Sequence, residues 1–413
     1  MKRIILYYAI LMLCMTFGCS SSHDDGDETK PSPEEKKGTE DDGKGVTTIS
    51  LTEAQKGYVE HGNEFALRLF CQTASKGGSM AQSPLSVASL LGMLVNGADD
   101  ETLTEILTVL GMGDIGAGDV NAYFSTLLTA FPKLDSLTEV TIGNGIFVSH
   151  SHPLLSEFSQ TVAKAYGAEV ASLDFSTPEA LTQINSWASK VTQGKIDGLM
   201  SQTDPLAVVI AVNAVYFKGE WTTRFNAEET SQEVFGATGR QVQMMHRKGK
   251  MAYGENDTCQ IVSLPYGNGA FSMTVMLPRE QVAMNQFLDL LDKEHFALWN
   301  KTQEEKTIDL KLPRFEADSE NGLNSDLSAL GLSSVFAFQP GFNRMCSDVV
   351  FVSDFRQKVR VIVDEEGSEA AAATSDTVVP ISVVDAQMHV NRPFVYVISE
   401  QSTGAILFIG VQE

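Results

Sequence analysis

Few residues in the sequence have the types and spacing that catalysis or metal binding needs. A serine hydrolase of the α/β type carries its nucleophile in a G-x-S-x-G turn, and the sequence contains no such turn. His150 and His152 could place two imidazoles on one strand face, but without a third ligand nearby we interpret them as a surface pair. Cys71, Cys259 and Cys346 are scattered without C-x-x-C spacing, so each is interpreted as a buried apolar residue. The sequence therefore predicts no enzyme, no metal site and no cofactor.

The stretch 363–393, VDEEGSEAAAATSDTVVPISVVDAQMHVNRP, is the most informative part of the chain. A β-branched run ends at Val363, and Gly367 then supplies a flexible pivot. From Ser368 to Val379 the chain avoids proline and bulky side chains. A plain surface loop or a short Ala-rich helix would suit this composition, but neither explains why so long a segment avoids both.

The body, 49–413, is predicted to be one domain whose first part is helical. Tyr58, Phe65 and Leu69 recur at helical spacing, and Ser83-Pro84 and Thr177-Pro178 are typical helix starts. Strands are predicted later, at 207–217, 271–277, 307–312, 359–363, 394–398 and 405–409. Helices first and strands afterwards indicate an α+β fold with large sheets rather than alternating βαβ units.

Six blocks resemble, in the same order, signatures of the serpin family, and they span about residue 57 to the end. They are SPLS at 83–86, LVNGA at 94–98, INSW with TQGKI at 184–196, NAVYFKGEW at 213–221, LPRF at 312–315 and NRPF at 391–394. Each block alone is weak, but six in order are specific. The resemblance implies several helices packed on large, mainly antiparallel sheets, with an exposed reactive-centre loop at about 367–390.

The resemblance also implies an irreversible, suicide-type inhibitor of serine endopeptidases. The target protease would cut the loop and become trapped as a covalent acyl complex while the freed segment enters a sheet as a new strand. The hinge residues would be Glu365, Glu366, Gly367, Ser368, Glu369, Ala370, Ala371, Ala372, Ala373 and Thr374. Alternation along the strand would bury Ser368, Ala370, Ala372, Thr374, Asp376 and Val378. Asp376 is the exception in this small-residue set, because burying an unpaired charge is costly.

Family spacing puts the reactive bond about fourteen residues past Gly367, at Ile381–Ser382. The residues before it, Val378, Val379 and Pro380, would fill the neighbouring subsites of the protease. An aliphatic side chain at the cut suits elastase-like or subtilisin-like enzymes. Trypsin-like enzymes are disfavoured because no Arg or Lys occurs between Gly367 and Arg392.

Other residues match family positions that control opening of the sheet. Glu365 would pair with Arg314 where the family has a Glu–Lys pair, and Trp221 would lie at the entry of the new strand. Ser83, Ser86 and Asn213 match a polar cluster under the sheet. Gln357 replaces the usual His and could bond to Asn213 and the serine hydroxyls. Ordinary capping, core packing or a surface ion pair remain alternatives for each.

The N-terminus is predicted to target the protein to a membrane. Residues 1–18 read as a lipoprotein signal peptide, with Lys2 and Arg3 before an apolar run too short to span a bilayer. Small residues before Cys19 resemble a lipobox, in which Cys19 carries the lipid; an ordinary secretory signal is the alternative. Residues 19–48 form an acidic Ser/Gly/Pro tether, either a solvated spacer or a surface-export signal like that of Bacteroidetes-type lipoproteins. We therefore expect an outer-membrane lipoprotein of a Gram-negative bacterium, at the surface or facing the periplasm.

The formal net charge of −23 limits the partners. Phosphate backbones repel such a polyanion, so no nucleic acid is expected, and without a Lys/Arg stripe no heparin-type cofactor is expected either. We expect a monomer. Two other functions stay open. One is a non-inhibitory serpin-fold carrier or binding protein, which Asp376 favours and Ala370–Ala373 argue against. The other is a structural or glycan-binding surface lipoprotein.

Overall fold

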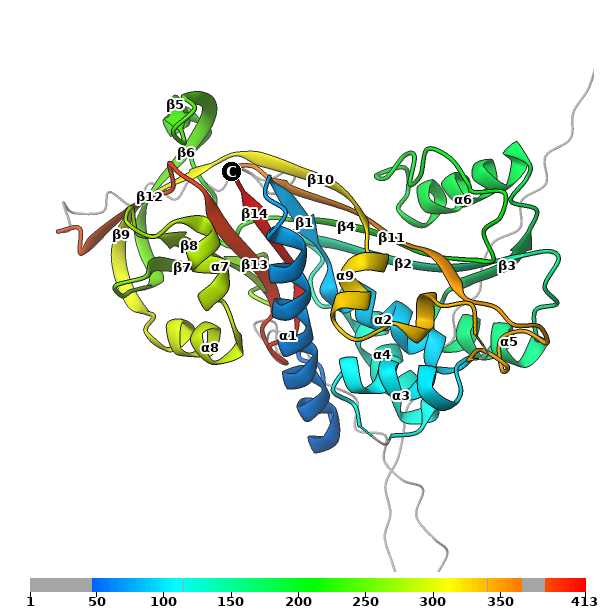
Figure 1. Ribbon diagram of the computed structural model, residues 1–413. Helices are drawn as coiled ribbons and strands as arrows, with labels where there is room; N and C mark the ends of the chain where they lie inside the picture. Colours follow the sequence, from blue (N-terminus) through cyan, green and yellow to red (C-terminus); the bar gives the residue numbers. More distant parts are fainter. Residues whose placement is uncertain (1–46, 114, 340, 366–382) are drawn as a thin grey trace, which may run out of the picture. The chain divides into compact units, whose positions relative to one another are not determined.

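The computed structural model describes residues 47–113, 115–339, 341–365 and 383–413 (Figure 1). Helices are α1 (Glu53–Ala74), α2 (Pro84–Val95), α3 (Asp100–Val109), α4 (Ala117–Ala130), α5 (Ser156–Tyr166), α6 (Pro178–Val191), α7 (Met284–Leu290), α8 (Lys293–Lys301) and α9 (Asn324–Ala329). Short 3₁₀ turns are η1 (Phe131–Lys133), η2 (Ala227–Glu229) and η3 (Ser334–Phe336). None of the described helices is both long and apolar enough to cross a bilayer.

One sheet has the strand order β10-β11-β4-β2-β3 within the described chain. Its strands are β2 (Thr138–Ser149), β3 (Glu169–Leu173), β4 (Val209–Gly219), β10 (Phe315–Gly322) and β11 (Val352–Val363). Neighbours are antiparallel except β4 with β11 and β2 with β3. The predicted central position of the apolar run at 207–217 is confirmed, because β4 lies in the middle of this sheet.

A second sheet has the order β1-β14-β13-β8-β7-β6-β9-β12, with β5 paired to β6. Its strands are β1 (Met80–Gln82), β5 (Ser231–Phe235), β6 (Arg240–Glu255), β7 (Cys259–Tyr266), β8 (Phe271–Pro278), β9 (Glu304–Pro313), β12 (Ala386–His389), β13 (Phe394–Glu400) and β14 (Ile406–Gln412). At one edge, β12 runs parallel to β9. β12 is the first described strand after residue 382, so it anchors the chain on the far side of the proposed loop.

Helices cover both faces of the five-stranded sheet (Figure 1). Every residue of α2 is buried, as expected for a helix that is apolar on all sides and packed inside the molecule. On the opposite face, α6 packs against β2, where the Trp187 ring meets Phe147 edge to face with centroids 5.8 Å apart. Both faces of β4 are thereby buried, which accounts for its nearly continuous apolar sequence.

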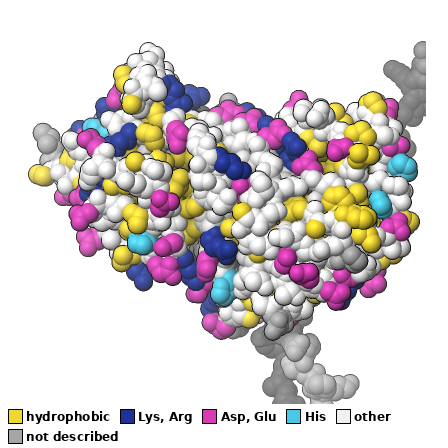
Figure 2. All heavy atoms as spheres, in the orientation of Figure 1, with side chains coloured by type: hydrophobic (Ala, Val, Ile, Leu, Met, Phe, Trp, Pro, Cys, Tyr) yellow, Lys and Arg dark blue, Asp and Glu magenta, His cyan; other side chains and the backbone are white. Residues whose placement is uncertain are grey.

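The α+β class predicted from the sequence is confirmed, and helices begin at Pro84 and Pro178 as expected. The simple order of helices first and strands afterwards is wrong in one respect. β2 and β3 lie between helices in the chain, and β2 is the direct neighbour of β4. On the face drawn in Figure 2, Lys and Arg side chains are interspersed with Asp and Glu, so they form no continuous basic stripe there.

Candidate functional site

The joint between β4 and β11 is where a new strand could enter. The two strands pair directly and in parallel, from Val352 opposite Val209 to Val361 opposite Phe217. Their outer neighbours β2 and β10 are each antiparallel to them. A strand entering between β4 and β11 in the opposite direction would be antiparallel to both, the slightly more stable pairing. The described residues therefore show the closed sheet, with no strand in this joint.

The chain just beyond β11 is tied to β4 and to the second sheet. The Trp221 indole N–H donates to the Asp364 carbonyl at 2.7 Å, and the ring stacks on Tyr266 with centroids 4.2 Å apart. Lys218, near the end of β4, has its ammonium 3.4 Å from the Asp364 carboxylate. Trp221 thus contacts the chain directly after β11, and its role at the entry of a new strand stays a prediction.

Glu365 is the last described residue before 383 and is buried, with 7% of its surface exposed. The Phe225 amide donates to its carbonyl at 3.2 Å, and the Thr230 hydroxyl donates to its carboxylate at 2.9 Å. The predicted contact with Arg314 is present, with Nη1 3.6 Å from Oε2. Arg314 is more than half exposed, so solvent screens this ion pair. The hydrogen bonds from Phe225 and Thr230, which the sequence did not reveal, hold Glu365 more firmly.

A polar cluster lies buried between α2 and the sheet, as predicted. The Gln357 amide accepts from the Ser83 N–H at 2.9 Å and donates to the Ser83 carbonyl at 2.9 Å and the Ser86 hydroxyl at 2.8 Å. The predicted bond from Gln357 to Asn213 is wrong, because the Gln357 contacts all go to Ser83 and Ser86. Asn213 instead donates to Asn144 of β2 at 2.5 Å.

The cluster consists of two separate halves. Gln357 of β11 bonds only to α2, whereas Asn213 of β4 bonds to Asn144, which in turn accepts from the Ser89 hydroxyl of α2 at 3.2 Å. No side-chain hydrogen bond within these two halves crosses from β11 to β4. The two halves are joined only through α2, which bonds to Gln357 through Ser83 and Ser86 and to Asn144 through Ser89. Asn144 and Ser89 were missed because neither lies in one of the six segments that resemble family signatures.

On the outer face, three diagonal ion pairs join β10 to β11: Glu316–Arg360, Asp318–Lys358 and Glu320–Arg356. Arg360 also donates to the Lys195 carbonyl at 2.8 Å. Lys195 belongs to the connection after α6 and reaches β2 and β4, with its ammonium 3.6 Å from the Glu139 carboxylate and 5.4 Å from the centre of the Tyr216 ring. This connection therefore bridges the joint from β11 to β4.

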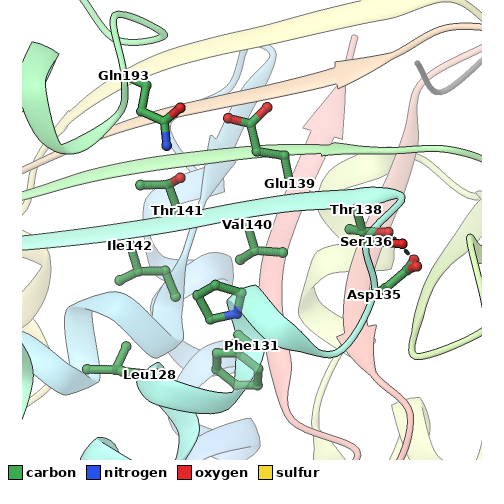
Figure 3. Close-up of a pocket in the computed structure, with 11 residues that line it drawn as sticks. Leu128, Phe131, Asp135, Ser136, Thr138, Glu139, Val140, Thr141, Ile142 and Gln193 are labelled. Atoms are coloured by element: carbon green, nitrogen blue, oxygen red, sulfur yellow. Dashed lines mark hydrogen bonds between the residues drawn. The ribbon is translucent and has the colours of Figure 1, made fainter. Parts of the chain in front are cut away.

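A pocket of about 430 Å³ lies between α4, η1 and β2, beside this connection (Figure 3). Leu128, Phe131 and Ile142 form its apolar wall, and Glu139 and Gln193 lie at its polar side (Figure 3). The Gln193 backbone is left-handed, with φ of 51°. The pocket thus touches the connection that spans the joint and lies apart from Glu365.

Residues outside the described ranges keep their predicted roles as predictions. They are Cys19, Glu366, Gly367, Ser368, Glu369, Ala370, Ala371, Ala372, Ala373, Thr374, Val378, Val379, Pro380, Ile381 and Ser382.

The histidines and cysteines noted in the sequence form no site in the described chain. His150 and His152 follow β2 in a turn and contact different carboxylates, Asp174 at 3.8 Å and Asp348 at 3.5 Å. No group of three potential metal ligands occurs among the described residues. Burial raises the thiol pKa of Cys71 and Cys259 to about 12 and that of Cys346 to about 11, so none is a ready nucleophile.

Known proteins resemble this chain over most of its length. The family model described as Serpin (serine protease inhibitor) matches residues 60–412. Human Serpin B3 is 31% identical over 380 residues, covering 85% of this chain and 97% of its own, and mouse Leukocyte elastase inhibitor A is 30% identical, covering 84% and 96%.

Solved structures also resemble this chain over most of its length. The thermophilic serpin Tengpin in its native state has a TM-score of 0.81 at 27% identity, with 89% of this chain and 96% of that chain covered. Human thyroxine-binding globulin in complex with its ligand has a TM-score of 0.79 at 26% identity, with 87% and 98% covered. The motifs, the two sheets and the matched length agree, and the chain belongs to the serpin family.

Proposed function

We propose that the protein is a suicide-type inhibitor of serine endopeptidases, elastase-like or subtilisin-like, which cut it at Ile381–Ser382. The observation that carries this proposal is the direct parallel pairing of β4 with β11. An antiparallel strand inserted there would gain backbone hydrogen bonds on both sides. The small, proline-free segment from Ser368 to Val379 suits such a strand, because small side chains pass most easily between parting strands.

The chemistry belongs to the target protease. Its serine attacks the Ile381 carbonyl, the peptide bond to Ser382 breaks, and an ester joins the protease to Ile381. Insertion of about a dozen residues contributes roughly 0.5–1.5 kcal/mol for each new hydrogen bond, on the order of 10 kcal/mol in all. Loss of one oxyanion-hole donor removes about 3–4 kcal/mol of transition-state stabilisation, so a distortion of the protease driven by insertion would slow hydrolysis of the ester if insertion occurs first.

The segment after the cut is anchored separately. The Asp385 amide donates to the Thr307 carbonyl at 2.8 Å, and the Thr307 amide donates to the Asp385 carboxylate at 2.7 Å. β12 then pairs with β9. The new N-terminus at Ser382 would stay on this edge while Ile381 moves away with the protease, so the two cut ends separate.

The test uses purified protein with a pancreatic-type elastase, followed by a denaturing gel. A covalent band larger than the inhibitor supports the proposal, whereas clean cleavage without an adduct overturns it. Ile381→Arg is the matched variant, because the proteases' primary pocket reads this side chain. We expect the variant to lose the adduct with elastase and to gain one with trypsin.

The second candidate is a non-inhibitory carrier or binding protein of the same fold. Asp376 favours it, because a charge in the inward-facing set opposes insertion. The similarity to thyroxine-binding globulin, solved in complex with its ligand, is compatible with it. The same gel separates the two functions, since a carrier yields cut chain and no adduct.

We also propose that the protein is anchored through lipidated Cys19 in the outer membrane of a Gram-negative bacterium. The basic start, the short apolar run and Gly18-Cys19 support this. Labelling with a radioactive fatty acid should mark the wild type and not Cys19→Ala, and equal labelling of both would exclude the anchor.

A further inference from the structure

A second pocket of about 430 Å³ lies beside β12, and every side chain that lines it is polar or charged. The lining comes from β7, from the turn after β8, from β12 and from the segment between β12 and β13. The residues that matter here are Gln260, Arg279, Gln281, Gln387, Asn391 and Arg392. Pockets for apolar ligands are lined mostly by apolar side chains, so a ligand of this pocket must be recognised through hydrogen bonds and charge.

Arg392 is held in place by neutral oxygens. Its Nε and Nη2 donate to the Pro278 carbonyl at 3.1 and 2.8 Å, and its Nη1 donates to Asn391 Oδ1 at 3.3 Å. Within the described chain it forms no ion pair with a carboxylate. A guanidinium has five N–H donors, so one hydrogen on each terminal nitrogen of Arg392 stays free.

Arg279 lies at the same turn, because Arg392 holds the carbonyl of Pro278, the residue directly before it. Its Nε donates to the Asn256 carbonyl and its Nη2 to Glu255 Oε2, both at 2.9 Å. Its Nη1 makes no hydrogen bond among the described residues, so both hydrogens of this nitrogen are available.

The two guanidinium groups are close enough to repel each other. Burial lowers the pKa of the Arg392 guanidinium, the charge of Arg279 lowers it further, and the charge of Glu280 offsets only part of these effects. Glu280 is exposed and forms no ion pair with either arginine. An anion bound between the two arginines would relieve this repulsion.

Asn391 and the glutamines add neutral hydrogen-bonding groups. Since Asn391 Oδ1 accepts from Arg392, its Nδ2 is left as a donor. The Gln260 amide donates to the Gln387 carbonyl at 2.8 Å and ties β7 to β12. The side chains of Gln281 and Gln387 are exposed and make no hydrogen bond within the described chain, so they can contact a ligand.

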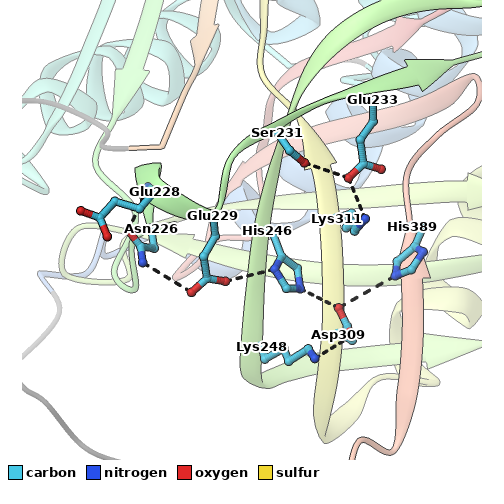
Figure 4. Close-up of polar contacts among 10 residues, drawn as sticks. All are labelled: Asn226, Glu228, Glu229, Ser231, Glu233, His246, Lys248, Asp309, Lys311 and His389. Carbon is cyan, nitrogen blue, oxygen red and sulfur yellow. Dashed lines mark hydrogen bonds and ion pairs between the residues drawn. The ribbon is translucent and has the colours of Figure 1, made fainter.

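His389 lines the pocket but belongs to a neighbouring cluster. Figure 4 shows its ring directed toward Asp309, with Nε2 3.9 Å from Oδ1. Asp309 is already contacted by His246 at 2.9 Å and by Lys248 at 3.2 Å. Burial would raise the pKa of the Asp309 carboxyl, but the hydrogen bonds from His246 and Lys248 outweigh burial and lower it. The site therefore consists of the two arginines and Asn391.

We propose that Arg279, Arg392 and Asn391 bind a phosphate group, either the free anion or the end group of a small hydroxylated ligand. Guanidinium groups suit this role because their forked donors match the oxygens of phosphate. The group would accept from Arg279 Nη1, from the free hydrogens of Arg392 and from Asn391 Nδ2. The amides of Gln281 and Gln387 would meet hydroxyl groups of a larger ligand. This site goes beyond the proposed inhibition and requires neither cleavage nor insertion.

Titration calorimetry on the intact protein tests the site at pH 8, with the ionic strength held constant by chloride. The probes are inorganic phosphate, glucose 6-phosphate and glucose. We expect saturable one-to-one binding of the two phosphates and none of glucose. Since a chain with a net charge of −23 repels anions in general, saturable binding reports a local site. Glucose 6-phosphate binding at least tenfold tighter than phosphate assigns the larger ligand, and equal affinities assign the free anion.

Two variants locate the binding. Arg392→Lys keeps the charge and loses the forked donors, and Arg279→Gln removes the charge. Each should weaken phosphate binding about tenfold, as for loss of one charge-assisted hydrogen bond. Arg240→Gln is the matched control: Arg240 is exposed at the start of β6, lies over the Phe235 ring at 5.0 Å and forms no ion pair within the described chain. Its affinity for phosphate should equal that of the wild type.

The absence of saturable binding of both phosphates overturns the site. Wild-type affinity in both Arg392→Lys and Arg279→Gln also overturns it, as does equal weakening in Arg240→Gln, which would indicate general charge attraction. Thermal unfolding checks that each variant is folded, and Arg279→Gln carries the test if Arg392→Lys is not. Adduct formation on the gel is independent of these results, so either proposal can fail while the other holds.

Discussion

Gln357 illustrates how one side chain can hold a strand to a helix. Its amide satisfies the N–H and the carbonyl of Ser83 at the start of α2, and all three groups are buried. Gln357→Ala would leave the buried Ser83 N–H unpaired, while the Ser83 carbonyl keeps its bonds from the Val87 N–H and the Ser86 hydroxyl. We therefore expect a loss of about 2–3 kcal/mol in the free energy of unfolding. Urea unfolding of the intact protein measures it.

Asn213→Ala is the internal comparison. Asn213 Oδ1 has no hydrogen-bond partner, and Asn144 keeps its bond from Ser89 when the Asn213 amide is removed. We therefore expect a smaller loss, about 1 kcal/mol. Equal losses in the two variants would contradict the division of the cluster into two halves.

Asp309 predicts how acid affects stability. Since its folded pKa is lowered, it contributes stability above its unfolded pKa of about 4, and that stability is lost as pH falls through the lower folded value. Asp309→Asn removes the contribution. Thermal unfolding from pH 5 to 2 should show the variant below the wild type at pH 5 and the gap closing toward pH 2; a gap that widens in acid would refute the assignment.

At the residue scale, the sequence predicted contacts best where a motif specified both partners. The Glu365–Arg314 contact was foreseen. The partners Phe225 and Thr230 were not, because they come from a segment folded back across the molecule and carry no distinctive residue type. The contacts of His246 with Glu229 and Asp309 were missed for the same reason: the three residues lie on three elements, η2, β6 and β9, and span 80 residues of the chain (Figure 4).

Among the elements, the proposed insertion would require β11 to remain with β10 and part from β4. The ion pairs between β10 and β11 hold these two strands together. The bond from Arg360 to the Lys195 carbonyl opposes the separation of β11 from β4. A lysine at 360 could reach Glu316 or the Lys195 carbonyl but not both. We expect Arg360→Lys to speed entry of a synthetic peptide with the sequence of residues 368–379 about fivefold, as for loss of one hydrogen bond. Native gels follow the entry.

Arg356→Lys provides the control for this prediction. Arg356 lies on the same face of β11, but its acidic partners Glu320 and Asp354 are on β10 and β11 themselves. These strands move together, so the substitution should leave peptide entry unchanged. Similar acceleration by both variants would argue against a role for the connection after α6.

Elements were predictable where local signals agreed with the tertiary structure. Ser83-Pro84 and Thr177-Pro178 marked two helix starts correctly. β2 was hidden because Gly143 and Gly145 interrupt its apolar pattern. A Cβ at Gly143 would lie 2.6 Å from Val191, and one at Gly145 would lie 3.2 Å from Trp187, so both glycines make room for α6. Packing between distant segments sets this requirement.

For the whole molecule, the closed five-stranded sheet is proposed to be a kinetically trapped state, and its lower-energy form has a sixth strand in the β4–β11 joint. Cutting at Ile381–Ser382 should release it. With about 10 kcal/mol gained, we expect the cut protein to melt about 20 °C or more above the intact protein. Circular dichroism on both forms measures the shift, and equal melting temperatures would leave a shared fold without a trap.

Two arginine substitutions test whether strand entry causes that shift. Alternation places Ala370 toward the core of the opened sheet and Ala371 toward its outer face. Ala370→Arg would drive a buried charge into the joint, so the cut variant should melt near the intact protein and should release the protease instead of trapping it. Ala371→Arg adds the same charge one position along and should behave like the wild type. If the two variants gave the same melting shift and adduct yield, the segment would not enter the sheet with this alternation, and the trapping mechanism would lose its structural basis.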